Sequence, residues 1–288
     1  MKLATNMIGL DTVYGHYKMI DVLAESGFNG IDFNADKEEY YTDAHDKNFY
    51  TEWRKYAEDK GVYFTQAHAP FASSFVDEEA TKRRFDEITE SMKISSWMGA
   101  EMIVVHPCKH IPYHIKGNGE KMFEYNFNMY KKLIPYSEEY EIKIAIENTN
   151  EKFGQFYSHS CCTKAEELAK MIDTLNSPCF TVCLDVGHAN LLREKPSQMI
   201  RVLGSRIGCL HIHDNDGMAD QHTLPYHGTL NWDDIMEALA DVDYKGDLSY
   251  EAGLFFLNSP EEVREDALKY MAAVGHNLIK KFEEFKRK

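Results

Sequence analysis

Three features are missing from the sequence, and each absence excludes a class of protein. No apolar run approaches the roughly 20 residues that a membrane helix needs, so we expect a cytoplasmic protein without a membrane partner. No Gly-x-Gly-x-x-Gly fingerprint follows the first apolar segment, which argues against a dinucleotide-binding fold. No stretch rich in glycine, serine or proline interrupts the chain, so residues 1–288 are predicted to form one domain.

Cysteine is scarce for a chain of 288 residues. The six cysteines include no C-x-x-C pair, which excludes the usual zinc-finger spacings and gives no sign of a disulfide framework. We therefore expect reduced thiols and a structure held together by its hydrophobic core.

Basic side chains are outnumbered, because 32 lysines and arginines face 47 aspartates and glutamates, for a net charge of −15. Such a field repels polyanions within about a Debye length, so nucleic acid is a disfavoured partner unless a local basic patch overcomes it. Residues 36–46 are also strongly acidic.

Short apolar, β-branched runs recur along the chain and read as buried strands. They cover residues 3–8, 30–33, 62–68, 102–106, 143–147, 180–185, 207–211 and 247–251. Helical patterns lie between them, including 78–98, 120–140, 164–175 and 233–242. Eight strands in 288 residues give 36 residues per unit, so we predict an α/β fold of the (β/α)8 TIM barrel type. A doubly wound open sheet is the competing architecture.

Polar residues stand at the carboxyl ends of six consecutive predicted strands. These residues are His68, His106, Glu147, Asp185, His211 and Glu251. In a barrel the carboxyl ends of the strands converge on one mouth, where active sites form. A buried ring of carboxylates and imidazoles is costly without a compensating cation, so the pattern predicts a divalent metal.

The motifs around these residues resemble those of the xylose isomerase-like TIM barrel superfamily. They are Leu-Asp-Val-Gly-His-Ala-Asn at 184–190, His-Ile-His-Asp-Asn-Asp-Gly at 211–217, Asp-Gln-His at 220–222, and Gly-Thr-Leu-Asn-Trp at 228–232. The superfamily holds ketose 3-epimerases, inosose dehydratases, inosose isomerases and endonuclease IV. The resemblance spans essentially the whole chain.

The resemblance implies a metal quartet and further ligands. Glu147, Asp185, His211 and Glu251 match the quartet of the sugar isomerases and epimerases, and His188 matches a histidine that contacts substrate. Five positions match the additional zinc ligands of endonuclease IV: His68, His106, His188, Asp220 and His222. One ion is favoured and up to three can be accommodated. Carboxylates favour Mn²⁺, Mg²⁺ or Co²⁺, and the additional histidines favour Zn²⁺.

The number of ions separates the two functions implied by the resemblance. One divalent cation leaves the quartet with a net negative charge, which suits a neutral polyol, whereas three cations give a positive site suited to a phosphodiester. The acidic segment 36–46 favours the sugar. We therefore predict a metal-dependent sugar or sugar-phosphate isomerase or epimerase of carbohydrate metabolism, acting on a sugar or cyclitol. The alternative is an endonuclease IV-like zinc phosphodiesterase acting at abasic DNA.

The implied mechanism moves a proton next to a carbonyl through an enediolate. Glu147 and Glu251 would serve as base and acid, with His188 on a substrate hydroxyl. Asn148 and Asn190 are predicted to orient the ligands. His213 is left out of the ligand set because it lies beyond the predicted strand end.

One departure from the ketose 3-epimerases stands at Gly217, where those enzymes usually carry arginine. Recognition of the substrate hydroxyls must therefore differ. A lyase of the inosose dehydratase type remains an alternative, as does a sugar-binding barrel without activity. The chain can also form a homo-oligomer.

Overall fold

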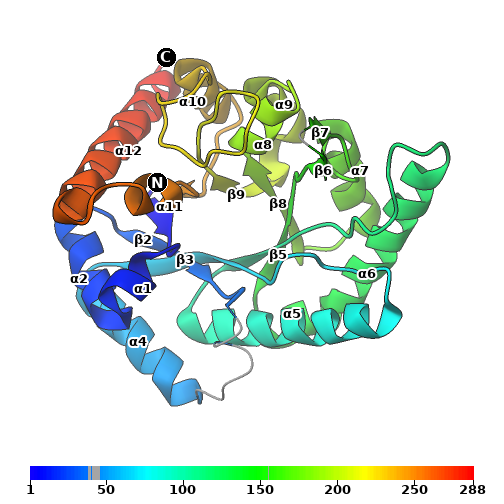
Figure 1. The fold of residues 1–288 in the computed structure, drawn as a ribbon, viewed down its shortest axis with the longest axis horizontal. Helices are drawn as coiled ribbons and strands as arrows, with labels where there is room; N and C mark the ends of the chain where they lie inside the picture. Colours follow the sequence, from blue (N-terminus) through cyan, green and yellow to red (C-terminus); the bar gives the residue numbers. More distant parts are fainter. Residues whose placement is uncertain (38–39, 41–45, 155) are drawn as a thin grey trace.

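The computed structural model describes residues 1–37, 40, 46–154 and 156–288. Eight parallel strands run in the order β10-β1-β2-β3-β4-β5-β8-β9, and Figure 1 shows helices around them. The strands are β1 (Leu3–Asn6), β2 (Gly30–Asn34), β3 (Tyr63–His68), β4 (Met102–Val105), β5 (Lys143–Glu147), β8 (Phe180–Asp185), β9 (Ile207–His211) and β10 (Leu248–Tyr250). The predicted (β/α)8 barrel and all eight predicted strands are confirmed.

Helices follow the strands and cover the outside of the barrel (Figure 1). They are α1 (Leu10–Tyr14), α2 (His16–Ser26), α4 (Lys47–Asp59), α5 (Glu78–Met98), α6 (Asn118–Tyr140), α7 (Ala165–Leu175), α8 (Val186–Leu191), α9 (Pro196–Leu203), α10 (Trp232–Asp241), α11 (Gly253–Leu257) and α12 (Arg264–Lys286), with 3-10 turns η1 (Gly204–Arg206) and η2 (Glu261–Val263). The four helices predicted from the sequence are α5, α6, α7 and α10. A small antiparallel hairpin, β6 (Glu151–Phe153) with β7 (Phe156–Ser158), was not predicted.

Local capping residues define both ends of α5 and the start of α10. The Asp77 carboxylate accepts a hydrogen bond from the Ala80 amide at the start of α5, and Gly99 ends that helix in the left-handed conformation with φ of 85°. Asn231 accepts from the Asp234 amide at the start of α10. These caps set the lengths of the loops that lead to and from the strands.

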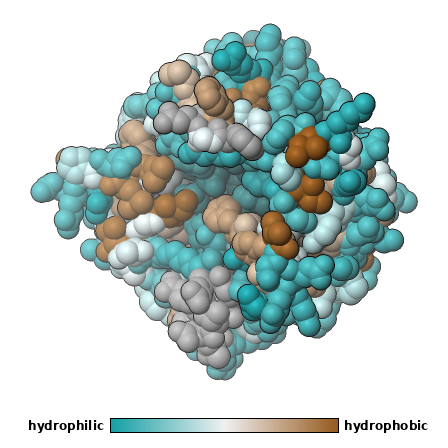
Figure 2. All heavy atoms as spheres, turned by 45° about the vertical axis from the view of Figure 1, so that its right-hand side comes forward, coloured by the Kyte–Doolittle hydropathy of each residue, from teal (hydrophilic) through white to brown (hydrophobic). Residues whose placement is uncertain are grey.

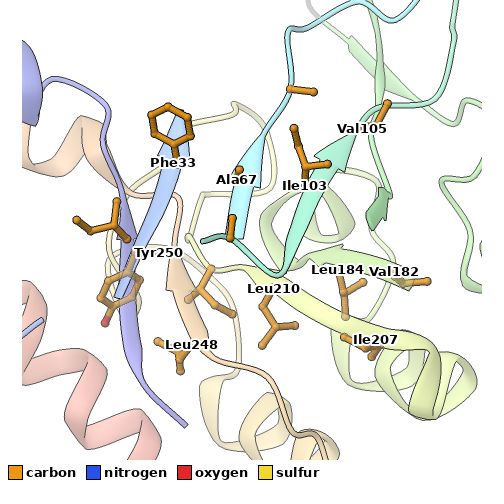
Figure 3. Close-up of a cluster of buried hydrophobic side chains, with 14 of the residues drawn as sticks. Phe33, Ala67, Ile103, Val105, Val182, Leu184, Ile207, Leu210, Leu248 and Tyr250 are labelled. Carbon is orange, nitrogen blue, oxygen red and sulfur yellow. The ribbon is translucent and has the colours of Figure 1, made fainter. Parts of the chain in front are cut away.

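Strand alternation separates two layers of buried side chains. Figure 3 shows apolar residues such as Ile103, Val105 and Leu184, which belong to the main core. The alternate positions form a second, smaller cluster: Val104, Ala145, Cys183 and Cys209. We assign this cluster to the barrel interior, where small side chains fit. The next inward-facing residue along each of these strands is polar. The predicted polar ligands therefore lie next to this cluster, at the carboxyl ends of the strands.

The ring closes between β9 and β10 through a short connection. Ile212 and Tyr250 form an isolated parallel bridge. The Ile212 amide donates to the Ser249 carbonyl at 2.8 Å, and the Glu251 amide donates to the Ile212 carbonyl at 3.0 Å. The chain after β9 therefore stays extended past His211.

Two further expectations from the sequence concern membrane-spanning helices and the acidic segment 36–46. None of the helices in the described ranges is long and apolar enough to cross a membrane. The acidic segment 36–46 lies mostly outside the described residues, because the structure describes only Asp36, Lys37, Tyr40 and Asp46 of it.

Candidate metal centre and active site

The structure brings the nine predicted ligand positions together at the carboxyl ends of the strands. Three groups have donor atoms that all lie within 4.8 Å of one another. They are Glu147, Asp185, His211 and Glu251; His68, Glu147 and His211; and His188, His213, Asp220 and His222. His106 joins them through Glu147, with its Nε2 2.7 Å from Glu147 Oε2. Strand register contributes directly, since Asp185 stands opposite His211.

The predicted quartet is buried and its donors point at one another. His211 Nδ1 lies 3.3 Å from Glu147 Oε1 and 3.4 Å from Glu251 Oε2. Glu147, Asp185 and His211 are fully buried, and Glu251 is 8% exposed. Glu251 Oε2 makes no hydrogen bond within the described part of the chain. Three carboxylates around one imidazole, with an unsatisfied oxygen, fit a divalent cation.

The two glutamates of the quartet have environments that separate their pKa values. Burial opposes ionisation of Glu147, but the imidazoles of His106 and His211 hold its pKa well below the usual range. Burial raises the pKa of Glu251, and the neighbouring histidines only partly offset that increase. Hence Glu147 is the more firmly ionised of the two.

The group of His188, His213, Asp220 and His222 lies beside the quartet on the β8 and β9 side. His188 Nε2 is 3.5 Å from Asp220 Oδ2, and His222 Nε2 is 3.3 Å from Asp220 Oδ1. Burial disfavours the charged form of His222, yet the Glu251 and Asp220 carboxylates raise its pKa to about 9. His188, His222 and Asp220 therefore offer two imidazoles and a carboxylate that could bind a cation.

The group of His68, Glu147 and His211 also contacts His106. His68 Nε2 and His106 Nε2 lie 3.1 Å apart, and His68 Nε2 is 3.6 Å from Glu147 Oε2. Burial lowers the pKa of His106 to about 4, so this imidazole is neutral at pH 7 and available as a ligand.

His213, which the sequence analysis left out of the ligand set, lies among the site residues. It is fully buried and its ring stacks on that of His222, with centroids 4.1 Å apart. Alternation could have found it, because Cys209, His211 and His213 have the same parity and the extended chain continues past β9. The predicted strand 207–211 coincides with β9, and the isolated bridge at Ile212 extends the chain beyond it toward His213.

Asn148 and Asn190 take different positions. Asn148 exchanges two hydrogen bonds of 2.8 Å with the backbone of Asp185, which holds that ligand in place. Asn190 instead donates to Asn215 Oδ1 at 2.8 Å and to Thr229 Oγ1 at 3.0 Å. It therefore contacts the loop after β9, and its predicted role in orienting a ligand would be indirect.

Asp214 organises the same loop and was not predicted to do so. Its buried carboxylate accepts hydrogen bonds from the Trp232 indole at 2.8 Å and the Leu230 amide at 3.2 Å. The Asp214 and Thr223 backbones also pair with each other. This network fixes the segment that presents Asp220 and His222.

A cavity of about 280 Å³ opens onto the three groups. It is lined by Ile8, Phe71, His106, His188, Asp220, His222, Glu251, Gly253 and Leu254. Figure 2 shows one face of the molecule, where apolar side chains gather in separate groups on a mostly hydrophilic surface. The lining combines apolar residues such as Ile8, Phe71 and Leu254 with the predicted polar ligands, as in pockets that bind small molecules.

Sequence comparison identifies the family. The sequence model of the xylose isomerase-like TIM barrel matches residues 20–274. The chain belongs to this family. The family assignment agrees with the barrel and with the resemblance carried by the sequence motifs.

Individual proteins are similar to this chain at low sequence identity. An uncharacterized protein of Methanocaldococcus jannaschii, MJ1311, is 26% identical over 189 residues, which cover 64% of this chain and 62% of that protein. A D-psicose 3-epimerase of Enterocloster bolteae is 24% identical over 235 residues, covering 80% and 74%. The crystal structure of a D-tagatose 3-epimerase-like protein superposes with a TM-score of 0.76 at 21% identity, covering 100% and 98%.

Proposed function

We propose that the protein is a metal-dependent sugar isomerase or epimerase that transfers a proton next to a carbonyl group. The quartet of Glu147, Asp185, His211 and Glu251 beside a cavity of sugar size carries this proposal. Relatives named as D-psicose 3-epimerase and fructoselysine 3-epimerase support it. A dehydratase, which also begins with removal of such a proton, is the nearest variation in chemistry, and a mannonate dehydratase is among the relatives.

The quartet would hold one divalent cation, with Mn²⁺, Mg²⁺ and Co²⁺ favoured by its three carboxylates. When bound, the cation supplies positive charge next to the substrate oxygens as the enediolate forms. Asn148 holds the backbone of Asp185, so that ligand has little freedom to turn away.

The chain's own groups would move the proton. Glu251 lines the cavity and has an oxygen without a hydrogen bond, so it can approach a substrate carbon from that side. Glu147 is fully buried, with its Oε2 2.7 Å from His106 Nε2, and would act on the opposite face of the substrate carbon. His188 lines the cavity and would contact a substrate hydroxyl, with Nδ1 facing the Asn148 carbonyl at 3.1 Å and Nε2 facing Asp220.

The lining of the cavity favours an uncharged sugar over a sugar phosphate. Among the described residues that line it, none is lysine or arginine. Lys109 lies three residues after His106, but its Nζ–H donates to the Asn150 carbonyl at 2.8 Å and it is not part of the lining. A phosphate group would therefore find neither lysine nor arginine in this lining, the side chains that most often bind phosphate.

Exchange of substrate hydrogen with solvent tests the proposal. Protein loaded with Mn²⁺ or Co²⁺ is incubated in D2O with a panel of ketoses, keto-glycosides and inososes, and with the phosphorylated ketoses. We expect deuterium at the carbon next to the carbonyl of an uncharged substrate, measured by NMR. No exchange on any member of the panel would reject the isomerase and epimerase assignment, and exchange confined to the phosphorylated sugars would reject the uncharged substrate.

The endonuclease IV-like alternative is supported by one observation, the gathering of all nine predicted ligands into three adjoining groups. Loading with Zn²⁺ followed by elemental analysis measures how many ions bind. About three zinc ions per chain, with nicking of a duplex that contains an abasic site, would favour that function. One ion per chain and an intact duplex would exclude it.

A further inference from the structure

Asp32 lies behind the metal quartet and was not part of any predicted site. It stands on β2, is 2% exposed, and its Oδ2 lies 3.2 Å from His211 Nε2. The Gln66 side chain on β3 donates to the same oxygen at 2.8 Å. Asp32 and Gln66 have the inward parity of their strands, since Ile31, Phe33 and Ala67 belong to the outer core.

The two nitrogens of His211 face different groups. Nε2 faces Asp32, while Nδ1 faces Glu147 Oε1 and Glu251 Oε2. If Nδ1 coordinates a cation held by the quartet, the proton of the ring lies on Nε2. The Asp32 carboxylate is placed to accept that proton in a hydrogen bond.

We propose that Asp32 is a positioning residue for the metal centre, acting through His211. It fixes the ring orientation and the tautomer that presents Nδ1 as a ligand, and its charge makes that nitrogen more basic. Gln66 holds the carboxylate in place, because its Nε2 bonds to Asp32 and lies 3.4 Å from the Leu210 carbonyl. This inference rests on the metal-dependent function proposed above.

The burial of Asp32 argues against a purely structural role. Its Oδ1 is buried and makes no hydrogen bond within the described residues. An unsatisfied carboxylate oxygen in the interior destabilises a fold, and an apolar residue of similar size at this inward position would remove that cost. The contact that Asp32 gains in exchange is with the imidazole of His211, a predicted ligand.

Metal affinity, rather than turnover, tests the inference. The full chain is stripped of metal and titrated with Co²⁺ at pH 7.5 by calorimetry, and the visible absorption of bound Co²⁺ is recorded. We expect Asp32→Ala to weaken Co²⁺ binding by about 10- to 100-fold and to change the absorption spectrum. Asp32→Asn keeps a neutral acceptor oxygen, so its loss should be smaller, about several-fold. This variant also tests the idea if Asp32→Ala does not fold.

Asn34 provides the matched control, because it lies two residues along β2 and is also buried. Its Oδ1 accepts from the Met7 amide at 2.8 Å, and none of its bonds in the described structure reaches a ligand of the quartet. Asn34→Ala should lower the urea midpoint and leave Co²⁺ affinity within about twofold. Equal affinity of Asp32→Asn, Asp32→Ala and wild type would overturn the inference, as would an equal loss in Asn34→Ala.

The outcome for wild type separates this inference from the proposed function. If wild-type protein binds Co²⁺ but exchanges no substrate hydrogen, the isomerase assignment fails while the role of Asp32 is still decided by the titrations. If wild type binds no Co²⁺, both the metal centre and the role of Asp32 are rejected.

Discussion

His213 Nε2 lies 3.1 Å from both carboxylate oxygens of Asp185, and neither side chain is exposed. The imidazole therefore holds the carboxylate of a quartet ligand from behind. We expect His213→Ala to lower the affinity for Mn²⁺ by about tenfold or more, because Asp185 loses the group that orients it. Calorimetric titration of the metal-free protein measures the effect.

An exposed histidine supplies the control for that change. His227 lies on the loop after β9 and contacts Tyr270 of α12, and none of its bonds within the described residues reaches a predicted ligand. His227→Ala should bind Mn²⁺ as wild type does. Unchanged affinity in His213→Ala would show that Asp185 is oriented without it.

Because Gly187 has no side chain, the His213 ring can pack directly against its backbone. A Cβ at this position would lie 2.0 Å from His213 Cε1. Gly187→Ala should therefore displace the ring and destabilise the fold by about 1–3 kcal/mol, measured by urea unfolding. Gly119→Ala is the matched change, since its Cβ would meet nothing closer than Tyr113 Cε2 at 3.4 Å, and it should not destabilise α6. Wild-type stability in Gly187→Ala would contradict the packing described.

Glu251 offers the sharpest test of the proposed chemistry. Glu251→Gln keeps the shape of the cavity wall but removes the group that would transfer the proton, so deuterium exchange per bound metal should fall by about 10²- to 10⁴-fold. Glu194→Gln changes a carboxylate that pairs with His159 at 2.8 Å and should leave the rate unchanged. Retained exchange in Glu251→Gln would assign proton transfer to another group.

Removal of metal should lower thermal stability, because a cation that binds only the folded state stabilises it. At a free Mn²⁺ concentration of about 100 times Kd the stabilisation is about 2.7 kcal/mol. We expect EDTA to lower the unfolding temperature of wild type in differential scanning calorimetry. The same treatment should change Asp185→Asn much less, because that variant lacks one of the quartet carboxylates. Identical scans of wild type with Mn²⁺ and with EDTA would contradict a bound ion.

Thiol reactivity should depend weakly on pH in the folded protein. All six cysteines are buried, and burial raises the pKa of Cys108 to about 12. A raised pKa keeps the thiol protonated at pH 8, so little thiolate is available to react. A disulfide reagent should label almost no cysteine in native protein between pH 7 and 9, and six after unfolding in urea. Rapid native labelling that increases across this range would identify an exposed thiolate.

Periodicity predicted the barrel well because strand and helix patterns alternate regularly along the chain. The six polar residues at strand ends could also be found from the sequence, since they directly follow apolar runs, whereas the choice of four of them as a quartet came from the family resemblance. His213 and Asp32 were missed for a physical reason: each depends on a partner far away in sequence, Asp185 for one and His211 for the other. Parity along a strand indicates which face a residue occupies, but it does not say which side chain from another strand meets it.

The bridge between Ile212 and Tyr250 would give a cation bound by the proposed quartet a mechanical role. This short connection closes the ring, and each of its strands carries a ligand beside it, His211 on β9 and Glu251 after β10. A cation coordinated by both side chains would link β9 to β10 where the barrel closes. Loss of the ion would loosen this edge first, and the amide protons of Ile212 and Glu251 would report it through faster hydrogen exchange.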